Sequence, residues 1–364
     1  LCGVLMNTGG IAQKLIDFAK ILVGRIPGGL AHTNILGNTL FGSLSGSSVA
    51  ASVAIGGVLI PMEEKEGYDK KFAAAVNIAS APTGLIIPPS GILIIYPVLA
   101  GCSVVGMIMS GYIPGLMWAL ACMVVAYVIA KKNHYPTAGK VPASVFFKYF
   151  VDAIPSLLLI VIIVGGVMSG IFTATESAAV AVAYTLFLSI VVYRSIKIKD
   201  LPKILLDACE TTAVIMFLIA GSNVMSFVMS FTGLPSAIGN ALISVSSNKY
   251  VILLIINLVL LVVGCFMDIT PAVLIFTPIF LPVVQSFGMD PIHFGIMMVM
   301  NLGIGNITPP VGSALFSGCS VADMDMEDMI KPILPFYAAI FVALMLVAYV
   351  PWFSMALPTL FGAV

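Results

Sequence analysis

Apolar residues fill most of this chain in long runs, and short polar clusters interrupt the runs at intervals. A helix needs about 20 apolar residues to cross the hydrocarbon core of a bilayer. Runs of that kind lie at 104–130, 156–172, 178–193, 212–231 and 333–352. The pattern therefore predicts an all-α polytopic membrane protein.

Two stretches carry proline, glycine and aspartate in the same order, which indicates an internal repeat. Pro88-Pro89-Ser90-Gly91 recurs 221 positions later as Pro309-Pro310-Val311-Gly312. Further matches at that offset are Pro61 with Pro282, Gly67 with Gly288, Asp69 with Asp290, and Gly84 with Gly305. Several matches at one fixed offset favour a duplicated unit over chance.

Each copy has the same expected plan. An amphipathic segment (11–26 or 234–245) comes first, and a hairpin (30–62 or 249–286) follows it. A helix that is broken at its middle (72–95 or 291–318) completes the copy. The runs beside each hairpin tip have about 15 residues, too few to cross a bilayer comfortably. We therefore expect re-entrant hairpins whose irregular backbone is buried in protein or lines a wet cavity.

The count of crossings predicts that the two copies are inverted relative to each other. Five crossings separate Pro61 from Pro282 if the run 154–193 is divided at residues 173–177. That division places fifteen of the sixteen Lys and Arg residues on one face and leaves Lys249 on the other. By the positive-inside rule the shared face is cytoplasmic. The first hairpin then opens from the cytoplasm and the second from outside.

This plan divides the chain into a transport part and a scaffold part. The transport part is expected to comprise residues 30–103 and 249–321. The scaffold comprises 1–29, with an amphipathic arm, 104–248 and 322–364. A helix at 209–231 precedes the second copy, so symmetry predicts most of one further helix upstream of Leu1.

Inverted repeats with broken helices are typical of secondary transporters that bind their cargo near the bilayer midplane. A break frees carbonyl groups at one half-helix end and amides at the other. Carbonyls suit a cation and amides suit an anion. Asp268 is the single acid between residues 251 and 284, and inserting it costs about 2.5–3.5 kcal/mol. That penalty favours a cation partner; a carboxylate that caps the hairpin through Thr270 and backbone amides is the alternative.

Composition supports this class and excludes others. The chain has 364 residues, 60% hydrophobic and 9% charged, with zero net charge and a mean hydropathy of +1.14. A soluble domain carries about 25% charged residues, and nothing here indicates nucleic-acid binding. The six cysteines and three histidines show no metal-ligand spacing. An enzyme is not expected, because the serines lack a base within reach and Asp268 lacks an acidic partner.

Several ordered motifs resemble the large membrane (M) subunit of tripartite ATP-independent periplasmic (TRAP) transporters, from residue 1 to about 358. They are LMNTGGIAQKLIDFAKILVGRIPGGLAHTNILGNTLFGSLSGSSVA, LIPMEEKEGYDKKFAAAV, GLIIPPSG, GIFTATESAAVAVAY and NLGIGNITPPVG. The resemblance implies Na⁺-coupled uptake of an organic anion, such as a C4-dicarboxylate or a sialic acid, by an elevator mechanism in the bacterial inner membrane. It also implies a small four-helix membrane (Q) subunit and a periplasmic substrate-binding (P) protein as partners, with lipids around the chain.

The resemblance also implies which residues form the sites. One Na⁺ site would join Ser45, Ser47 and Ser48 to Ala81, Thr83 and Gly84. A second would join Asp268 and Thr270 to Gly303, Gly305 and Thr308. The substrate is expected near Ser43, Asn38, Ser90, Asn301 and Asn306, held by half-helix amides and hydroxyls because no buried Arg is evident. For the serines, close helix packing is the alternative role.

Two other functions stay open at this point. An ion channel would also place polar backbone at the midplane, although it does not need a matched inverted pair. A Na⁺/carboxylate symporter of the same fold that works without a binding protein is the second alternative.

Overall fold

The computed structural model describes residues 1–8, 10–137, 143–233, 237–238, 241, 244 and 248–363, and every regular element among them is helical. Seven of these helices are long and apolar enough to cross a membrane. They are Val104–Lys132, Phe147–Met168, Thr175–Val192, Ile198–Met229, Lys249–Phe266, Ile269–Ser286 and Met326–Tyr349. The prediction of an all-α polytopic membrane protein is confirmed.

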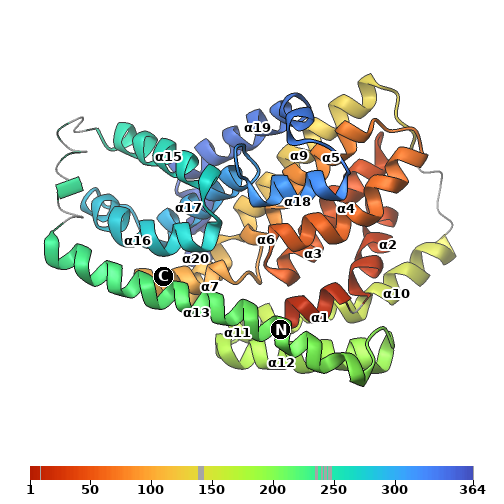
Figure 1. Cartoon of the computed structure of the whole chain (residues 1–364), viewed down its shortest axis with the longest axis horizontal. Helices are drawn as coiled ribbons and strands as arrows, with labels where there is room; N and C mark the ends of the chain where they lie inside the picture. The colour runs from red at the N-terminus through yellow and green to blue at the C-terminus, as the bar shows by residue number, and fades with distance from the viewer. Residues whose placement is uncertain are drawn as a thin grey trace.

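The first predicted hairpin and broken helix are both present (Figure 1). The chain reverses at Gly46, whose φ of 64° suits glycine, and at Ser47, which caps the following helix. Pro82 and the pair Pro88-Pro89 interrupt what would otherwise be one helix. The elements are α3 (Gly29–Ser45), α4 (Ser48–Lys65), α5 (Lys70–Ser80), α6 (Thr83–Ile86) and α7 (Ile92–Ala100).

The second copy repeats this plan with a single break. The chain reverses at Met267 and Asp268, and the later helix stops at Asn306, three residues before Pro309-Pro310. Its elements are α15 (Lys249–Phe266), α16 (Ile269–Ser286), α17 (Pro291–Asn306) and α18 (Ser313–Val321). The arms α15 and α16 have 18 residues each, or about 27 Å as helices, which is why length alone also admits them as spans. That the hairpins are re-entrant and the two copies inverted stays a prediction.

Matched glycines bring each hairpin into backbone contact with its broken helix. A Cβ atom on Gly84 would lie 2.2 Å from the Cα of Gly42, and one on Gly305 would lie 2.5 Å from the Cα of Gly264. Gly84 and Gly305 stand at equivalent positions of the repeat. The same small-residue contact therefore joins hairpin to break in both copies, as expected where helix backbones approach closely.

The remaining helices surround these two units (Figure 1). The long helix α13 runs along one edge and contacts α16 and α1. The elements are α1 (Cys2–Thr8), α2 (Ile11–Val23), α8 (Val104–Ser110), α9 (Tyr112–Lys132), α10 (Ala143–Ile160), η1 (Val161–Gly165), α11 (Gly166–Met168), α12 (Ala174–Phe187), η2 (Leu188–Val192), η3 (Ile198–Asp200), α13 (Leu201–Thr232), α19 (Met326–Tyr349) and α20 (Trp352–Leu360). The division into transport and scaffold parts stays a prediction.

The run 154–193 is divided into two helices, as the count of crossings requires. The helical chain that begins with α10 ends at Met168, and α12 begins at Ala174. Thr173 and Glu176 form a reciprocal capping box at the start of α12. The turn thus lies a few residues before the predicted position, because Thr173 is already the capping residue of the next helix. Glu176 serves this cap.

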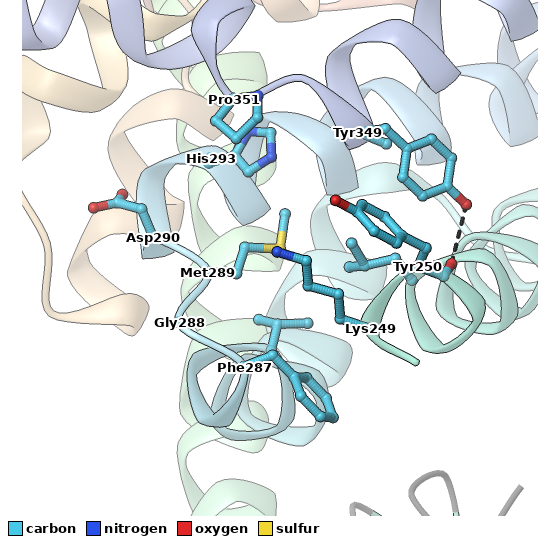
Figure 2. Close-up of a pocket in the computed structure, with 12 residues that line it drawn as sticks. Lys249, Tyr250, Phe287, Gly288, Met289, Asp290, His293, Tyr349 and Pro351 are labelled. Atoms are coloured by element: carbon cyan, nitrogen blue, oxygen red, sulfur yellow. Dashed lines mark hydrogen bonds between the residues drawn. The ribbon is translucent and has the colours of Figure 1, made fainter. Parts of the chain in front are cut away.

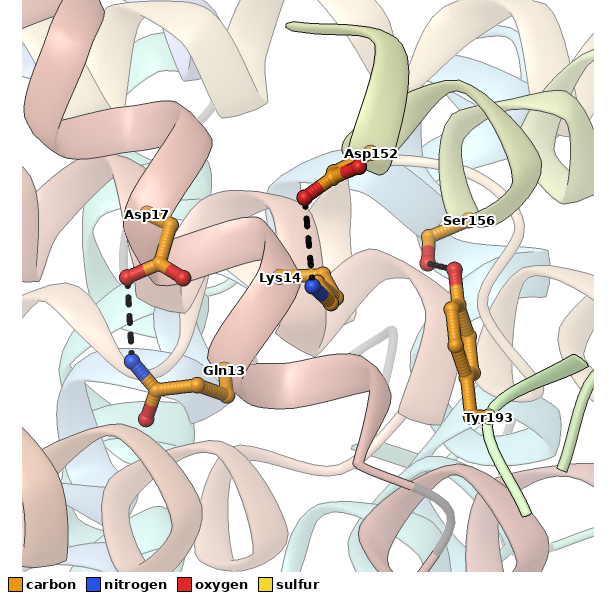
Figure 3. A network of polar contacts seen from close by, with 6 residues as sticks. All are labelled: Gln13, Lys14, Asp17, Asp152, Ser156 and Tyr193. Atoms are coloured by element: carbon orange, nitrogen blue, oxygen red, sulfur yellow. Dashed lines mark hydrogen bonds and ion pairs between the residues drawn. The ribbon is translucent and has the colours of Figure 1, made fainter. Parts of the chain in front are cut away.

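The first amphipathic segment forms α2, which packs its apolar face inward and lies against α10 (Figure 3). Lys14 pairs with Asp152 of α10 at 3.4 Å, and Gln13 donates to Asp17 at 3.0 Å. Both partners of the ion pair are about one-third exposed, so it adds little stability. Most of the second predicted amphipathic segment, 234–245, lies outside the described residues.

Replacing Gly84 by alanine tests the backbone contact. The new methyl group would overlap Gly42 at 2.2 Å, and overpacking of this kind costs about 1–3 kcal/mol. Gly84→Ala should therefore lower the thermal unfolding temperature of the purified protein in detergent. Gly57→Ala is the matched control, since its methyl would meet only Val321 at 3.9 Å; equal unfolding temperatures for both variants would contradict the contact.

Candidate functional site

A cavity of about 660 Å³ lies between the tips of the two hairpins. Its size is typical of sites for small molecules. One wall comes from the tips and the other from α13. The residues that line it are Ser45, Gly46, Ser47, Ser48, Val49, Leu85, Gly91, Ile92, Ile95, Glu210, Thr211, Val214, Ile215, Leu218, Asp268, Ile269, Thr270, Pro271 and Asn306.

The tip of the first hairpin supplies three hydroxyl groups to this cavity. Ser47 accepts a hydrogen bond from the backbone N–H of Ala50 at 3.2 Å and so caps α4. Ser45 donates to the carbonyl of Gly42 at 3.3 Å. A hydroxyl that donates in this way keeps oxygen lone pairs for a cation or another donor. The predicted set Ser45, Ser47 and Ser48 thus lies together at the cavity wall.

The tip of the second hairpin supplies a carboxylate. Asp268 precedes the first residue of α16, but within the described residues its side chain makes no capping hydrogen bond. Its Oδ1 instead accepts from the hydroxyl of Ser313 at 3.0 Å. The alternative role, a carboxylate held by Thr270 and backbone amides, therefore lacks its hydrogen bonds. Asp268 is exposed to the cavity beside Thr270.

Asn306 connects the two tips. Its Nδ2 donates to the hydroxyl of Ser48 at 2.8 Å. Its Oδ1 accepts from the Ser313 hydroxyl and from the backbone N–H of Ala314, the latter at 3.3 Å. Ser48, Asn306, Ser313 and Asp268 therefore form one polar cluster, in which Asn306 and Asp268 share the single hydroxyl proton of Ser313. The sequence groups each tip with its own break; the structure adds a side-chain bridge from the first tip to the second break.

The tips also meet their own breaks, through backbone. In the first copy a Cβ on Gly46 would lie 3.2 Å from the backbone nitrogen of Gly91. In the second, the N–H groups of Val311 and Gly312 donate to the carbonyl of Cys265 at 3.2 and 3.4 Å. Each tip therefore contacts its own break through backbone atoms, at residues other than those expected to bind Na⁺; the predicted Na⁺ sites stay predictions.

The predicted break residues do not line this cavity. Ala81, Thr83, Gly84, Gly303 and Gly305 are buried, and Thr308 is partly buried. The Thr83 hydroxyl donates to the carbonyl of Ser80 at 2.7 Å, and the Thr308 hydroxyl donates to that of Ile304 at 2.7 Å. None of these six residues lines the cavity as described.

Most of the predicted substrate residues are buried and do not line the cavity. Asn38 donates to Asn77 and Ser80, each at 3.0 Å, and Asn301 donates to Asn257 at 2.7 Å. Ser43 bonds to the carbonyl of Leu40, and Ser90 is 1% exposed. Of the five, the described cavity wall includes Asn306 alone. The Oδ1 atoms of Asn38 and Asn301 have no hydrogen-bond partner among the described residues, so both keep a free acceptor.

The cavity contains groups that attract cations as well as groups that attract anions. Asp268 and Glu210 bring two carboxyl groups, and the described lining residues include no Lys, Arg or His. The N-termini of α4, α7 and α16 reach the same cavity. Free amides at helix N-termini attract anions. The cavity therefore offers acidic oxygens to a cation and helix amides to an anion.

Sequence reasoning missed Glu210, Thr211 and Ser313. Glu210 stands at the edge of an apolar run, where an acid is ordinary, so only its place in the fold marks it. Ser313 could have been predicted from the sequence, since it is the first residue of the half-helix that follows a break.

A second cavity, of about 240 Å³, contains none of the predicted site residues (Figure 2). Lys249, Asp290 and His293 line it. The Lys249 ammonium lies 5.2 Å from the ring centre of Tyr250, and His293 Nδ1 is 2.6 Å from the Ser354 hydroxyl. It is formed by the starts of α15 and α17 and the junction of α19 with α20, away from the hairpin tips.

Comparison with known proteins agrees with this architecture. The family model of the DctM component of tripartite ATP-independent periplasmic transporters matches residues 1–353. The chain belongs to the TRAP large permease family. The earlier resemblance is thereby confirmed, and so is the expectation that the chain is a transporter subunit and not an enzyme.

Curated relatives are similar to this permease along almost its whole length. It is 52% identical over 363 residues to the uncharacterized protein YgiK of Salmonella typhimurium, covering 100% of this chain and 83% of the relative. It is 39% identical to the C4-dicarboxylate TRAP transporter large permease protein DctM of Pseudomonas aeruginosa, covering 100% and 85%. It is also 39% identical to the sialic acid TRAP transporter large permease protein SiaM of Vibrio cholerae, covering 99% and 84%.

Membership of the family and the seven candidate spans identify a multi-pass inner-membrane protein. Permeases of this family work in tripartite systems, with a small membrane subunit and a periplasmic binding protein. The exposed apolar side chains of α13, including Phe217, Phe227 and Phe231, are what lipid or another membrane subunit would cover.

Removing the bridge between the tips should destabilise this permease. Asn306→Ala leaves the buried Ser48 hydroxyl without its donor and removes the acceptor of Ser313, at a cost of about 1–3 kcal/mol. The unfolding temperature in detergent should fall further than for Ser48→Ala, which deletes a single bond. If the two variants unfolded at the wild-type temperature, Asn306 would not hold the tips together.

Proposed function

We propose that this permease imports an organic carboxylate together with Na⁺, receives the carboxylate from a periplasmic binding protein, and moves both by an elevator mechanism. The observation that carries the proposal is the composition of the cavity between the hairpin tips. It combines acidic side chains with helix N-termini and no basic side chain in its described lining. Such a cavity suits a cation and an anion bound side by side.

The donor set fits a hard cation. Carboxylate, hydroxyl, amide and carbonyl oxygens are what hard cations prefer, whereas nitrogen and sulfur suit transition metals. Asp268 and Thr270 at the second tip, and Ser45, Ser47 and Ser48 at the first, offer such oxygens. The described residues contain no cluster of three or more His, Cys, Asp or Glu side chains that would favour a transition metal. We infer Na⁺ as the cargo cation near Asp268.

The carboxylate of the substrate would lie against the amides at the N-termini of α4 and α16. Without a cation, it would meet Asp268 as a like charge. Two unit charges 4 Å apart repel by about 4 kcal/mol at an effective dielectric constant of 20. A Na⁺ ion between the two carboxylates attracts both of them, so the net interaction of the three charges becomes favourable. The two ligands should therefore bind cooperatively, which is the physical basis of symport.

The elevator part of the proposal rests on how the hairpins are joined. Gly42 with Gly84, and Gly264 with Gly305, lock each hairpin to its broken helix. The Ser48–Asn306 bond then ties the two copies to each other. A body connected in this way can move as one unit against helices such as α13. Both tips would belong to this moving unit, so the bound cation and anion would move with it.

The class of substrate follows from the relatives. The relatives with named substrates include a C4-dicarboxylate permease and a sialic acid permease, both 39% identical to this chain, and an isethionate permease, 36% identical. The C4-dicarboxylate and the sialic acid both carry a carboxylate, the group that helix N-termini would hold. We therefore propose an organic carboxylate, with the small membrane subunit and the binding protein of a tripartite system as partners.

Asp268→Asn tests the proposal, because it keeps the size of the side chain and removes the charge. In proteoliposomes with the partner subunits and binding protein, the Na⁺ concentration for half-maximal uptake should rise at least tenfold. The folded yield should match wild type, since Asp268 is exposed.

Asp207→Asn is the matched control: Asp207 is exposed on α13 and outside the described cavity lining. Unchanged Na⁺ dependence in Asp268→Asn would remove Asp268 from the cation site. A passive current that needs no substrate would favour a channel, and uptake without any binding protein would favour the simpler symporter.

A further inference from the structure

One charged residue in the cavity does not belong to the hairpins. Glu210 is contributed by α13, along with Thr211, Val214, Ile215 and Leu218. These positions are spaced as one face of a helix. Figure 1 shows α13 as the long helix along one edge, opposite the units that carry the tips. Glu210 is thus the acid that the opposite wall presents to the cargo.

Among the residues that the structure describes, Glu210 takes part in no recorded ion pair. The ion pairs recorded among the described residues are Lys14 with Asp152 and Lys71 with Asp328. The described lining of the cavity adds no Lys, Arg or His. Glu210 is exposed, so it faces the cavity as a hydrated carboxylate.

The charge of α13 is confined to one end. Lys203, Asp207 and Glu210 lie in its first third, and residues 211–232 contain no charged side chain. The positive-inside rule places Lys203 at the cytoplasmic face. Glu210 follows it by seven residues, or about 10 Å along the helix. The acid therefore lies in the cytoplasmic part of α13, and the rest of that helix is apolar or uncharged.

We propose that Glu210 is a release residue, which repels the substrate carboxylate when the hairpin tips lie beside the cytoplasmic part of α13. This inference rests on the proposed function, because it requires an anionic cargo that moves past α13. Repulsion acts only where the tips face Glu210, and the uncharged remainder of α13 exerts none. The carboxylate would therefore bind more weakly when the tips lie beside Glu210 than when they lie beside the uncharged part of α13, which favours its release on the cytoplasmic side.

Glu210 differs in role from Asp268, although both are acids. Asp268 sits on a tip, travels with the cargo in the proposed mechanism and is linked to the second break by Ser313. Glu210 belongs to the wall past which the cargo moves. A cation bound at Asp268 would offset that charge throughout, whereas Glu210 would act at one end of the movement. Glu210 therefore acts on release of the carboxylate and not on binding of the cation.

The test compares carboxylate affinity in wild type and in Glu210→Gln, which keeps the shape and removes the charge. The purified permease in Na⁺ buffer is titrated with succinate and with N-acetylneuraminate, and thermal stabilisation reports binding. Glu210→Gln should bind the carboxylate about three- to tenfold more tightly, the effect of one charge several ångströms away in a wet cavity. In proteoliposomes its maximal uptake rate should fall, because release slows, while its half-saturating Na⁺ concentration stays at the wild-type value.

A charge-conserving variant is the control, and four outcomes would count against the proposal. Glu210→Asp keeps the charge and should behave as wild type. Equal affinity in Glu210→Gln and wild type, or weaker binding in the variant, would overturn the release role; weaker binding would indicate a direct contact with donor groups of the substrate. A shifted Na⁺ dependence would make Glu210 a cation ligand instead. Wild type that binds neither probe in Na⁺ would refute the proposed function and this inference with it.

Discussion

The backbone groups left free where α17 stops and α18 begins dictate how the second hairpin packs. At membrane depth water does not satisfy them, so protein must. The N–H groups of Val311 and Gly312 bond to the carbonyl of Cys265, and the hydroxyl of Tyr337 bonds to the carbonyl of Ile307. Those bonds require the hairpin to lie directly on the break. Gly264 and Gly305 permit that approach, because a methyl group at either position would overlap the other backbone.

Once each hairpin lies on its break, the polar tips are brought to one place. Asn306 then links the copies, since it bonds both to Ser48 of the first tip and to Ser313, the partner of Asp268. The packing that satisfies the backbone of the breaks therefore also brings hydroxyls, a carboxylate and helix N-termini to the cavity between the tips. In the account proposed here, cation and anion binding both follow from this convergence, and the coupling between them follows from their closeness.

The sequence predicted the features that depend on local chemistry. Proline and glycine mark the breaks, and the run 154–193 is divided as predicted, although the predicted turn lies a few residues too late. What it did not predict depends on the packing of distant segments: the Ser48–Asn306 bond, the role of Ser313, and the place of Glu210 opposite the tips. Asn38 and Asn301 look like ligands in the sequence, yet their amide groups first serve contacts with Asn77, Ser80 and Asn257. The orientation of the two copies in the bilayer depends on a membrane, which the chain alone does not supply.

In the proposed mechanism, a cation and a carboxylate occupy the same cavity and strengthen each other's binding. The most direct measurement is a pair of titrations on the purified permease at constant ionic strength, Na⁺ replacing K⁺. One follows Na⁺ binding with and without a carboxylate, and the other follows carboxylate binding with and without Na⁺. The account predicts that each ligand raises the affinity for the other by the same factor, since linkage is reciprocal. Affinities that are independent of the second ligand would contradict it.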